Sequence, residues 1–373
     1  MSGTPGSGRP DPTTTLFQHA LRLHRLTPDT PLHRGGEPFP GVERRGRPRG
    51  EPEPDRALRG TDVARLLDHY FRAPDVSPGQ LAARLRRLPP ECRPDEHIAG
   101  AARRAPADRA RRTGRWLVRH GTDIGSVAVG LALLAESGTM ADIPRIQTVG
   151  LLSHWFGTLA AQALVRLPGG FEGLIWLGER VTGWGRVHVV ETLCRHVDDH
   201  PVVRPWLMRK ALDGDFLNSY FADRVAEVTG LHEIIAESGH DAALVDQAGR
   251  ILHVMTYCEG MGESLRYYPH ALAILEAHAR HVGALGPSAE RYFVAATVAA
   301  YLMKESPVRS DAPATRARWD AARRSYLALT DREDWCGAAR EGLAAGDHRL
   351  TCLADSVAPE LGLRAYRDDA RRA

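Results

Sequence analysis

The sequence predicts an all-α fold, arranged as an α-solenoid superhelix of stacked helical hairpins with a helical C-terminal subdomain. A short pattern recurs three times in the middle third of the chain: a large apolar residue, glycine, a polar residue, an aliphatic residue, a variable residue, and an apolar or small one. The copies are Ile124–Val129, Phe156–Ala161 and Trp184–Val189, and their glycines lie 32 and 28 residues apart. This spacing is typical of two-helix repeats. Elsewhere apolar residues recur at intervals of three and four, and we find no two-residue alternation that would indicate strands.

Length and composition favour a large globular protein in the cytoplasm. Of the 373 residues, 43% are hydrophobic and 25% are charged, which is ordinary for a chain that buries a sizeable core. The longest apolar run, 127–135, is far shorter than the roughly 18 residues that a membrane span needs. The first residues also lack the charged and apolar regions of a signal peptide. We therefore expect no membrane partner.

The cysteine pattern excludes two small-domain architectures. Five cysteines are present, far apart, and no two are separated by only two residues. A disulfide framework or a zinc knuckle needs paired or closely spaced cysteines, so we expect reduced and mostly buried thiols. The positions are Cys92, Cys194, Cys258, Cys336 and Cys352.

Residues 1–60 are expected to form a disordered N-terminal tail. Proline, glycine and arginine are frequent there and apolar side chains are sparse, so the segment cannot bury enough surface to offset the entropy of ordering it. One stretch, 15–26, has apolar residues at helical spacing. Two interpretations of it are open: it docks on the body of the protein, or it is a recognition helix for a partner.

Residues 61–120 are expected to form N-terminal basic helices. Thr61 and Asp62 are candidate caps for a helix over 63–72, and Ser77 followed by Pro78 is typical of the start of a second. A third, arginine-rich helix is expected over 108–119.

Residues 121–237 are expected to hold the repeats, and residues 238–373 the C-terminal helical subdomain. Glycine-containing turns separate successive apolar segments in the repeat region, whereas the helices after Gly230 look longer. The repeat helices are expected over 124–136, 141–152, 153–168, 171–180, 184–196, 202–212 and 219–228. The C-terminal helices are expected over 241–257, 263–281, 288–304, 314–329 and 331–345.

The middle third resembles HEAT-repeat and armadillo-like proteins. More narrowly, the motifs Arg119–Asp123, Val127–Leu131 and Glu179–His188 are similar to those of a family of bacterial HEAT-like proteins. Some members of that family carry the label limonene hydroxylase. An oxygenase needs haem, flavin or iron, and neither a dinucleotide-binding GxGxxG motif nor a two-His-one-carboxylate set is present. The resemblance therefore implies a HEAT-like fold over roughly residues 110–235 and no active site.

Two groups of histidines and carboxylates were considered as metal ligands. His196–His200 holds four potential ligands in five residues, but the two aspartates before Pro201 are typical of a solvated loop between helices. His270, Glu276, His278 and His281 fall on one expected helix, and no second helix supplies the matching Glu-x-x-His of a di-iron bundle. We expect no cofactor and no bound metal.

Polar residues replace small ones at matching positions of the last repeats. Ala128 and Leu131, then Ala160 and Ala163, give way to a set of polar and aromatic residues on helices expected to line the concave face. These groove candidates are Trp184, Arg186, His188, Glu191, Arg224 and Glu227. Three interpretations are open: His188 and Glu191 form an i,i+3 surface pair that merely supports its helix, the patch binds a partner, or the pair has a general acid/base role.

A basic stretch supports a different function. Eleven arginines and four carboxylates lie between Arg84 and Arg119, although the whole chain carries a net charge of only +3. Arginines on a helical rim contact phosphates in some proteins, and HEAT-like DNA glycosylases that remove alkylated bases hold DNA in a basic groove. The candidates are Arg103, Arg104, Arg111 and Arg112. We could match no residue to that family's catalytic aspartate.

The sequence thus favours a non-catalytic scaffold or adaptor that binds a protein through a concave face. Extended helical arrays offer long surfaces with many modest contacts, which suits such a role. The alternative is a DNA-binding HEAT-like protein, for example a DNA glycosylase that removes alkylated bases.

Overall fold

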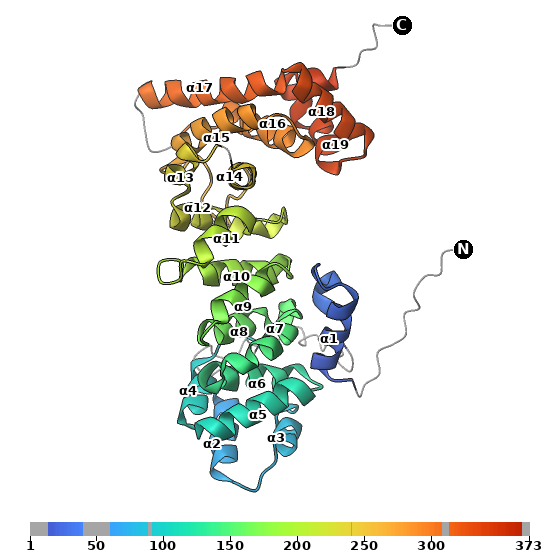
Figure 1. The fold of residues 1–373 in the computed structure, drawn as a ribbon, viewed down its shortest axis with the longest axis vertical. Coiled ribbons are helices and arrows are strands. Elements are labelled where there is room, and N and C mark those ends of the chain that lie inside the picture. The colour runs from blue at the N-terminus through green and yellow to red at the C-terminus, as the bar shows by residue number, and fades with distance from the viewer. Residues whose placement is uncertain (1–13, 40–59, 89–91, 240, 308–312, 368–373) are drawn as a thin grey trace, which may run out of the picture. The chain divides into compact units, whose positions relative to one another are not determined.

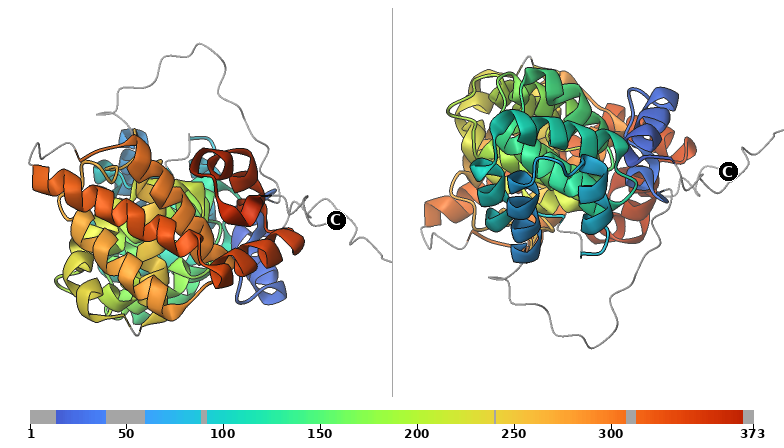
Figure 2. Two further views of the ribbon diagram at one scale, coloured as in Figure 1. Left: turned by 90° about the horizontal axis from the view of Figure 1, so that it is seen from above. Right: turned by 90° about the horizontal axis from the view of Figure 1, so that it is seen from below.

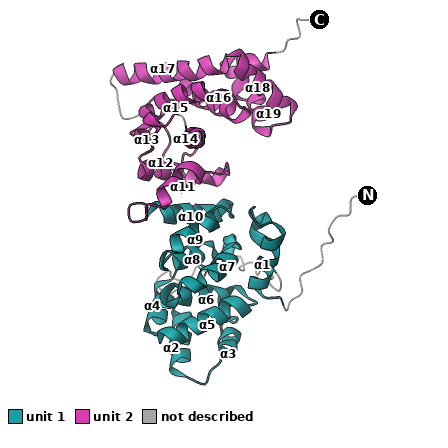
Figure 3. Cartoon of the chain, in the orientation of Figure 1, with its two compact units in different colours: residues 1–196 teal, residues 197–373 magenta. Residues whose placement is uncertain are grey.

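The computed structural model describes residues 14–39, 60–88, 92–239, 241–307 and 313–367, and these are helical with no strand among them (Figure 1). The all-α prediction is therefore confirmed for the described residues. The chain divides into two compact units, residues 1–196 and 197–373 (Figure 3). The division falls inside the region expected to hold the repeats, 121–237, so the expected hairpins are distributed over both units.

Unit 1 contains ten α-helices within its described residues. Most are short and joined by tight turns, as expected for hairpins. They are α1 (Leu16–Leu26), α2 (Thr61–Arg72), α3 (Pro78–Leu85), α4 (Glu96–Arg104), α5 (Ala107–His120), α6 (Ile124–Ser137), α7 (Ile143–Gly150), α8 (Ser153–Val165), α9 (Gly170–Gly178) and α10 (Gly183–Cys194), with 3₁₀ helices η1 (His33–Gly36) and η3 (Met140–Asp142).

The helices of unit 1 pack in two layers. Each of α5, α7 and α9 forms a hairpin with the helix that follows it. Helices α5, α7 and α9 contact one another in sequence order, and so do α4, α6, α8 and α10. The three copies of the repeated pattern begin or lie within the first turns of α6, α8 and α10. The pattern therefore marks the second helix of each hairpin, with a continuous apolar core between the layers.

Glycines allow the second helices to approach closely. A Cβ atom added to Gly157 would lie 3.5 Å from the Cα atom of Gly185. A Cβ atom on Gly185 would lie 2.4 Å from the Cβ atom of Ser153, closer than real side chains come. The glycine of the repeated pattern thus has a packing role between α8 and α10.

Helix starts in unit 1 are fixed by side-chain caps. Asp95 accepts a hydrogen bond from the backbone N–H of Ile98, and Asp123 accepts one from Ser126. Ser77 and Gln80 form a capping box at α3, as the Ser-Pro signal indicates. The first expected helix begins instead with Gly60 as its cap residue, in the left-handed region at φ 72°.

The expectation of a disordered tail over residues 1–60 is wrong for residues 14–39. Helix α1 packs against α5 and α7, and its side chains Leu16 and Ala20 are fully buried. The backbone N–H of Leu16 also donates to the carbonyl of Gly121 at 3.1 Å. Four apolar residues at helical spacing suffice to anchor this short segment. Residues 1–13 and 40–59 of the expected tail lie outside the described residues.

Unit 2 contains ten further α-helices within its described residues, several of them longer than those of unit 1. They are α11 (Val203–Lys210), α12 (Ala222–Thr229), α13 (Leu231–Glu237), α14 (Ala242–Met255), α15 (Ala271–Leu285), α16 (Ala289–Lys304), α17 (Pro313–Thr330), α18 (Glu333–Ala344), α19 (His348–Asp355) and α20 (Val357–Leu361), with 3₁₀ helices η4 (Phe216–Tyr220) and η5 (Arg364–Tyr366).

Helix α16 lies at the centre of unit 2. It contacts α14, α17, α18, α19 and α20, and α17 runs beside it (Figure 2). The fully buried aromatic side chains of Tyr292, Tyr326 and Trp335 form much of the core here. Large rings bury more apolar area than aliphatic residues do, so few of them are needed to hold these helices together.

One C-terminal helix begins later than expected. The helix expected over 263–281 is α15, which starts only at Ala271, and the preceding residues 263–270 form turns. Pro269 gives the physical reason, because it lacks the N–H that would bond within the helix and disfavours helical geometry in the residue before it.

Candidate functional site

The sequence-predicted patch on α10 is present as one exposed face of the helix. Trp184, His188 and Glu191 are spaced four and three residues apart and therefore share that face. The indole of Trp184 is 44% exposed and stacks on the imidazole of His188, with ring centroids 6.1 Å apart and planes at 29°. Glu191 is exposed one turn further on. The structure thus brings three of the groove candidates together.

The environment of this face changes the pKa of both titratable groups. Burial lowers the pKa of His188, and the positive charge of Arg93 lowers it further. Partial desolvation raises the pKa of Glu191 although its side chain reaches the surface, against the opposing effect of Arg195. His188 is therefore neutral at physiological pH, where its ring offers one hydrogen-bond donor and one acceptor rather than a charge.

Arg186 does not belong to the exposed face, which corrects the sequence prediction. Its side chain is buried, and its Nη1 donates to the backbone carbonyl of Gly178 at 2.5 Å. The guanidinium thereby links α10 to the last turn of α9. A position two residues from Trp184 on a helix points elsewhere, so its burial follows from the helical period.

Arg224 and Glu227 lie on α12 in unit 2. Both side chains are exposed, and they form an ion pair with each other at 3.0 Å. The two groove candidates on α12 are therefore paired with each other on the surface. Such exposed pairs contribute little to stability.

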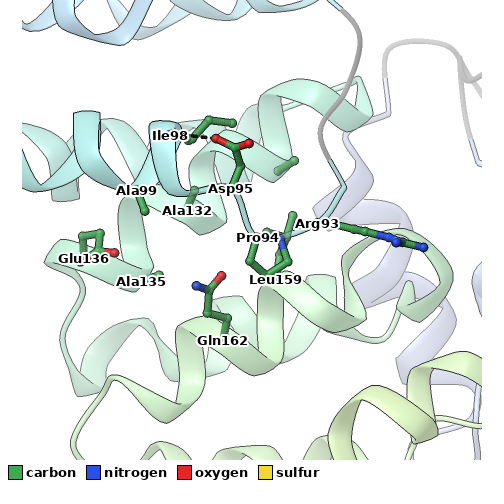
Figure 4. Close-up of a pocket in the computed structure, with 11 residues that line it drawn as sticks. Arg93, Pro94, Asp95, Ile98, Ala99, Ala132, Ala135, Glu136, Leu159 and Gln162 are labelled. Carbon is green, nitrogen blue, oxygen red and sulfur yellow. Dashed lines mark hydrogen bonds between the residues drawn. The ribbon is translucent and has the colours of Figure 1, made fainter. Parts of the chain in front are cut away.

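A small hollow lies beside the second helices of unit 1 (Figure 4). Its floor is formed by small side chains of α6, and Gln162 of α8 points into it, whereas Arg93 extends away from it. The hollow has a volume of about 10 Å³, close to the space for one water molecule. Pockets for small organic ligands measure about 300–1,000 Å³, so this hollow is a notch rather than a substrate chamber. Its lining comprises Arg93, Pro94, Asp95, Ile98, Ala99, Ala128, Ala132, Ala135, Glu136, Leu159 and Gln162.

Arg93 and Gln162 are residues that the sequence reasoning missed. Arg93 precedes α4, and its charge acts on His188 of α10 although 95 positions separate them. Nothing local in the sequence marks either residue, because their roles depend on how α4, α8 and α10 pack.

Three of the four arginines proposed for nucleic-acid binding are engaged by carboxylates. Arg103 contacts both Glu96 and Glu136, and Arg104 pairs with Asp68 at 2.9 Å. Arg111 pairs with Asp108 at 3.0 Å and donates to the carbonyl of Ser137. Arg112 is exposed. Of their carboxylate partners, Asp68 and Glu136 come from other helices, whereas Glu96 and Asp108 lie within the basic stretch itself.

The histidines considered as metal ligands have other partners. The ring of His196 contacts the carbonyl of Thr192 at 2.9 Å. His278 is buried against the hydroxyl of Tyr326 at 2.8 Å, while Glu276 pairs with Arg318. Within the described part of the chain, no three His, Cys, Asp or Glu side chains are placed to share a metal ion.

The helices and the comparisons add two observations. None of the helices in the described residues combines the length and apolar character that crossing a membrane requires. Comparison of the chain with protein-family models, curated proteins and solved structures finds no match. The interpretation of the site therefore depends on its geometry alone.

Proposed function

We propose that the protein is a non-catalytic scaffold or adaptor of HEAT-like α-solenoid architecture. In this proposal it binds a protein partner through the face formed by α6, α8 and α10 of unit 1. The two-layer packing of successive hairpins supports the architecture, because each added hairpin extends the surface of the second helices.

The observation that carries the proposal is the exposed indole of Trp184 on α10. Its stacking on His188 holds the ring in place without burying it. Tryptophan is enriched among the few residues that dominate binding energy at protein interfaces, and a ring held in advance loses little entropy on binding. The adjacent notch between α4, α6 and α8 offers space for a small group of the partner.

The test compares Trp184→Ala with the wild type in a quantitative pull-down from native lysate. We expect Trp184→Ala to lose proteins that the wild type captures, while its melting temperature stays within about 2 °C, because the removed ring is largely exposed. Met140→Ala is the matched control, since Met140 is 61% exposed in the same unit and belongs to η3 rather than to this face. Identical capture by wild type and Trp184→Ala contradicts the proposal.

A further inference from the structure

Unit 2 exposes a stacked pair of aromatic rings. Phe216, the first residue of η4, is 58% exposed, and Tyr257, just after α14, is 37% exposed. Their ring centroids are 6.2 Å apart and their planes are within 12° of parallel. Exposed apolar side chains are ordinary when scattered singly, whereas two exposed rings in contact form a defined surface.

Local hydrogen bonds hold the two rings in position. Asp215 accepts a bond from the backbone N–H of Leu217 at 2.8 Å, and the hydroxyl of Ser219 donates to the carbonyl of Phe216 at 2.8 Å. On the other side, the ring of Tyr257 meets His253 edge-on, with centroids 5.1 Å apart. The pair is thus preorganised, and a ligand that covers it would have little to rearrange.

Carboxylates act on Tyr257 and on Cys258, the residue that follows it. Burial raises the pKa of Tyr257, and the charge of Asp215 adds to the effect. Burial likewise raises the pKa of Cys258 to about 12, with contributions from the nearby carboxylates of Asp223 and Glu259. Among the described residues, Asp215, Asp223 and Glu259 form no ion pair. The carboxylate of Asp215 therefore acts on the ring of Tyr257 without a cation paired to it in this part of the chain.

Elsewhere in the protein, the same combination of ring and carboxylate holds an arginine. Arg180 lies 4.4 Å over the ring of Trp176 and pairs with Asp29. Arg266 lies 4.9 Å over the ring of Tyr267 and pairs with Glu305. The surface around Phe216 and Tyr257 has the ring and the carboxylate, but no arginine covers it among the described residues.

We propose that this aromatic–acidic patch, formed by Asp215, Phe216, Asp223, Tyr257 and Glu259, binds an arginine side chain of an extended segment from a partner protein. The guanidinium stacks on the exposed rings while its N–H groups pair with a carboxylate. Arginine fits better than lysine because its planar, weakly hydrated group satisfies both contacts at once. Phosphate-bearing partners such as nucleic acids are disfavoured by the carboxylates.

The patch lies in unit 2 and involves none of the residues of the proposed face in unit 1. The two proposals therefore fail or succeed separately, since Trp184→Ala leaves the patch intact and changes at Phe216 leave α10 intact.

Fluorescence anisotropy with the full-length protein tests this inference. The probe is a fluorescein-labelled Gly-Ser peptide with two arginines, compared with the same peptide carrying lysine or the neutral isostere citrulline. We expect the arginine peptide to bind most tightly. Phe216→Ala should weaken its binding about two- to fivefold, the effect of one exposed cation–π contact. Asp215→Asn should weaken it by a similar factor while keeping the oxygen that caps Leu217.

Matched variants separate the patch from general surface effects. Met303→Ala and Glu341→Gln remove an exposed apolar side chain and an exposed charge elsewhere in unit 2, and both should bind like the wild type. The proposal is overturned if the wild type shows no saturable binding up to about 1 mM, or if both patch variants bind the peptide unchanged. Equal affinity for the lysine peptide overturns the assignment to arginine.

Discussion

The buried carboxylate of Asp142 links α5 to the start of α7 in unit 1. Its side chain is fully buried at the start of α7, where Arg115 of α5 donates two hydrogen bonds at 2.6 and 2.9 Å. The backbone N–H of Thr139 supplies a third bond. Burial alone would raise the pKa of Asp142, but these bonds hold it below its usual value. The ionised form therefore stabilises the fold above pH 4, and this contribution is lost as the pH falls through the lowered value.

Replacing Asp142 with Ala should destabilise the protein by about 1–3 kcal/mol, because the half-buried Arg115 and the backbone N–H of Thr139 both lose their acceptor. Urea unfolding at pH 7 measures the change. Asp108→Ala is the control, since its ion pair with Arg111 is exposed and should contribute less than about 1 kcal/mol. Equal losses for the two variants would show that Asp142 has no special role.

His278 predicts a loss of stability in mild acid. Burial lowers the pKa of His278 to about 3, whereas an unfolded histidine titrates near 6.5. Above pH 6.5 His278 is neutral in both states and does not reduce the free energy of unfolding. Below that pH only the unfolded chain binds a proton at this histidine, so the free energy of unfolding declines as the pH falls. Between pH 7 and pH 5 the free energy of unfolding should fall by about 2 kcal/mol on this account.

The variant His278→Gln should flatten that pH dependence. The side-chain amide of glutamine can donate to or accept from the hydroxyl of Tyr326 but does not titrate. Urea unfolding at several pH values between 5 and 7 measures the slope. A variant with the slope of the wild type would assign the pH dependence to other groups.

Helix α1 is the element whose role changed most between sequence and structure. Its docking is extended by the segment that follows it: His19 contacts the carbonyl of Gly36 at 2.7 Å, and the indole of Trp155 donates to Glu37 at 3.0 Å. Arg180, in the turn after α9, also donates to the carbonyl of Pro28. Residues 14–39 thus cover part of the helices of unit 1 and belong to its folded structure.

Deletion of residues 1–39 should therefore lower the melting temperature by several degrees. Leu16→Ala, which empties a fully buried position, should cost about 2–5 kcal/mol. Differential scanning calorimetry measures both. The exposed neighbour Leu26, at 74% exposure on the same helix, provides the control Leu26→Ala, which should leave the melting temperature nearly unchanged. An unchanged melting temperature after the deletion would mean that the segment contributes nothing.

The sequence predicted the positions of helices better than the contacts between their side chains. Periodicity and turn residues placed α6, α8, α10, α14 and α16 because these depend on local patterns. The burial of Arg186, the pairing of Arg103 with Glu136 and the effect of Arg93 on His188 depend on contacts between helices. Such contacts are decided by packing angles and loop paths, which a single sequence does not display.

At the scale of the whole molecule, charge compensation bears on the nucleic-acid alternative. The chain carries a net charge of +3, and Arg103, Arg104 and Arg111 are engaged by carboxylates. Duplex binding requires cations free to replace the counterions of phosphates. The pairing of these three arginines counts against them as phosphate contacts.

We therefore expect no tight binding to a fluorescein-labelled DNA duplex at 200 mM salt, and only weak binding at 50 mM, in anisotropy titrations. Replacing Arg103, Arg104, Arg111 and Arg112 with Ala should change this little. Tight binding that these replacements abolish, together with a flattened salt dependence, would instead support the DNA-binding alternative.

The glycines Gly157 and Gly185 allow a close spacing between α8 and α10. A Cβ atom added at Gly157 would be in van der Waals contact with the Cα atom of Gly185, so the two helices come close together at this point. A methyl group added at Gly185 would meet Ser153 and force α10 to tilt or shift. Trp184 directly precedes Gly185, so its indole would move with the helix. On the proposed function, a substitution at Gly185 would therefore alter partner binding through the position of Trp184.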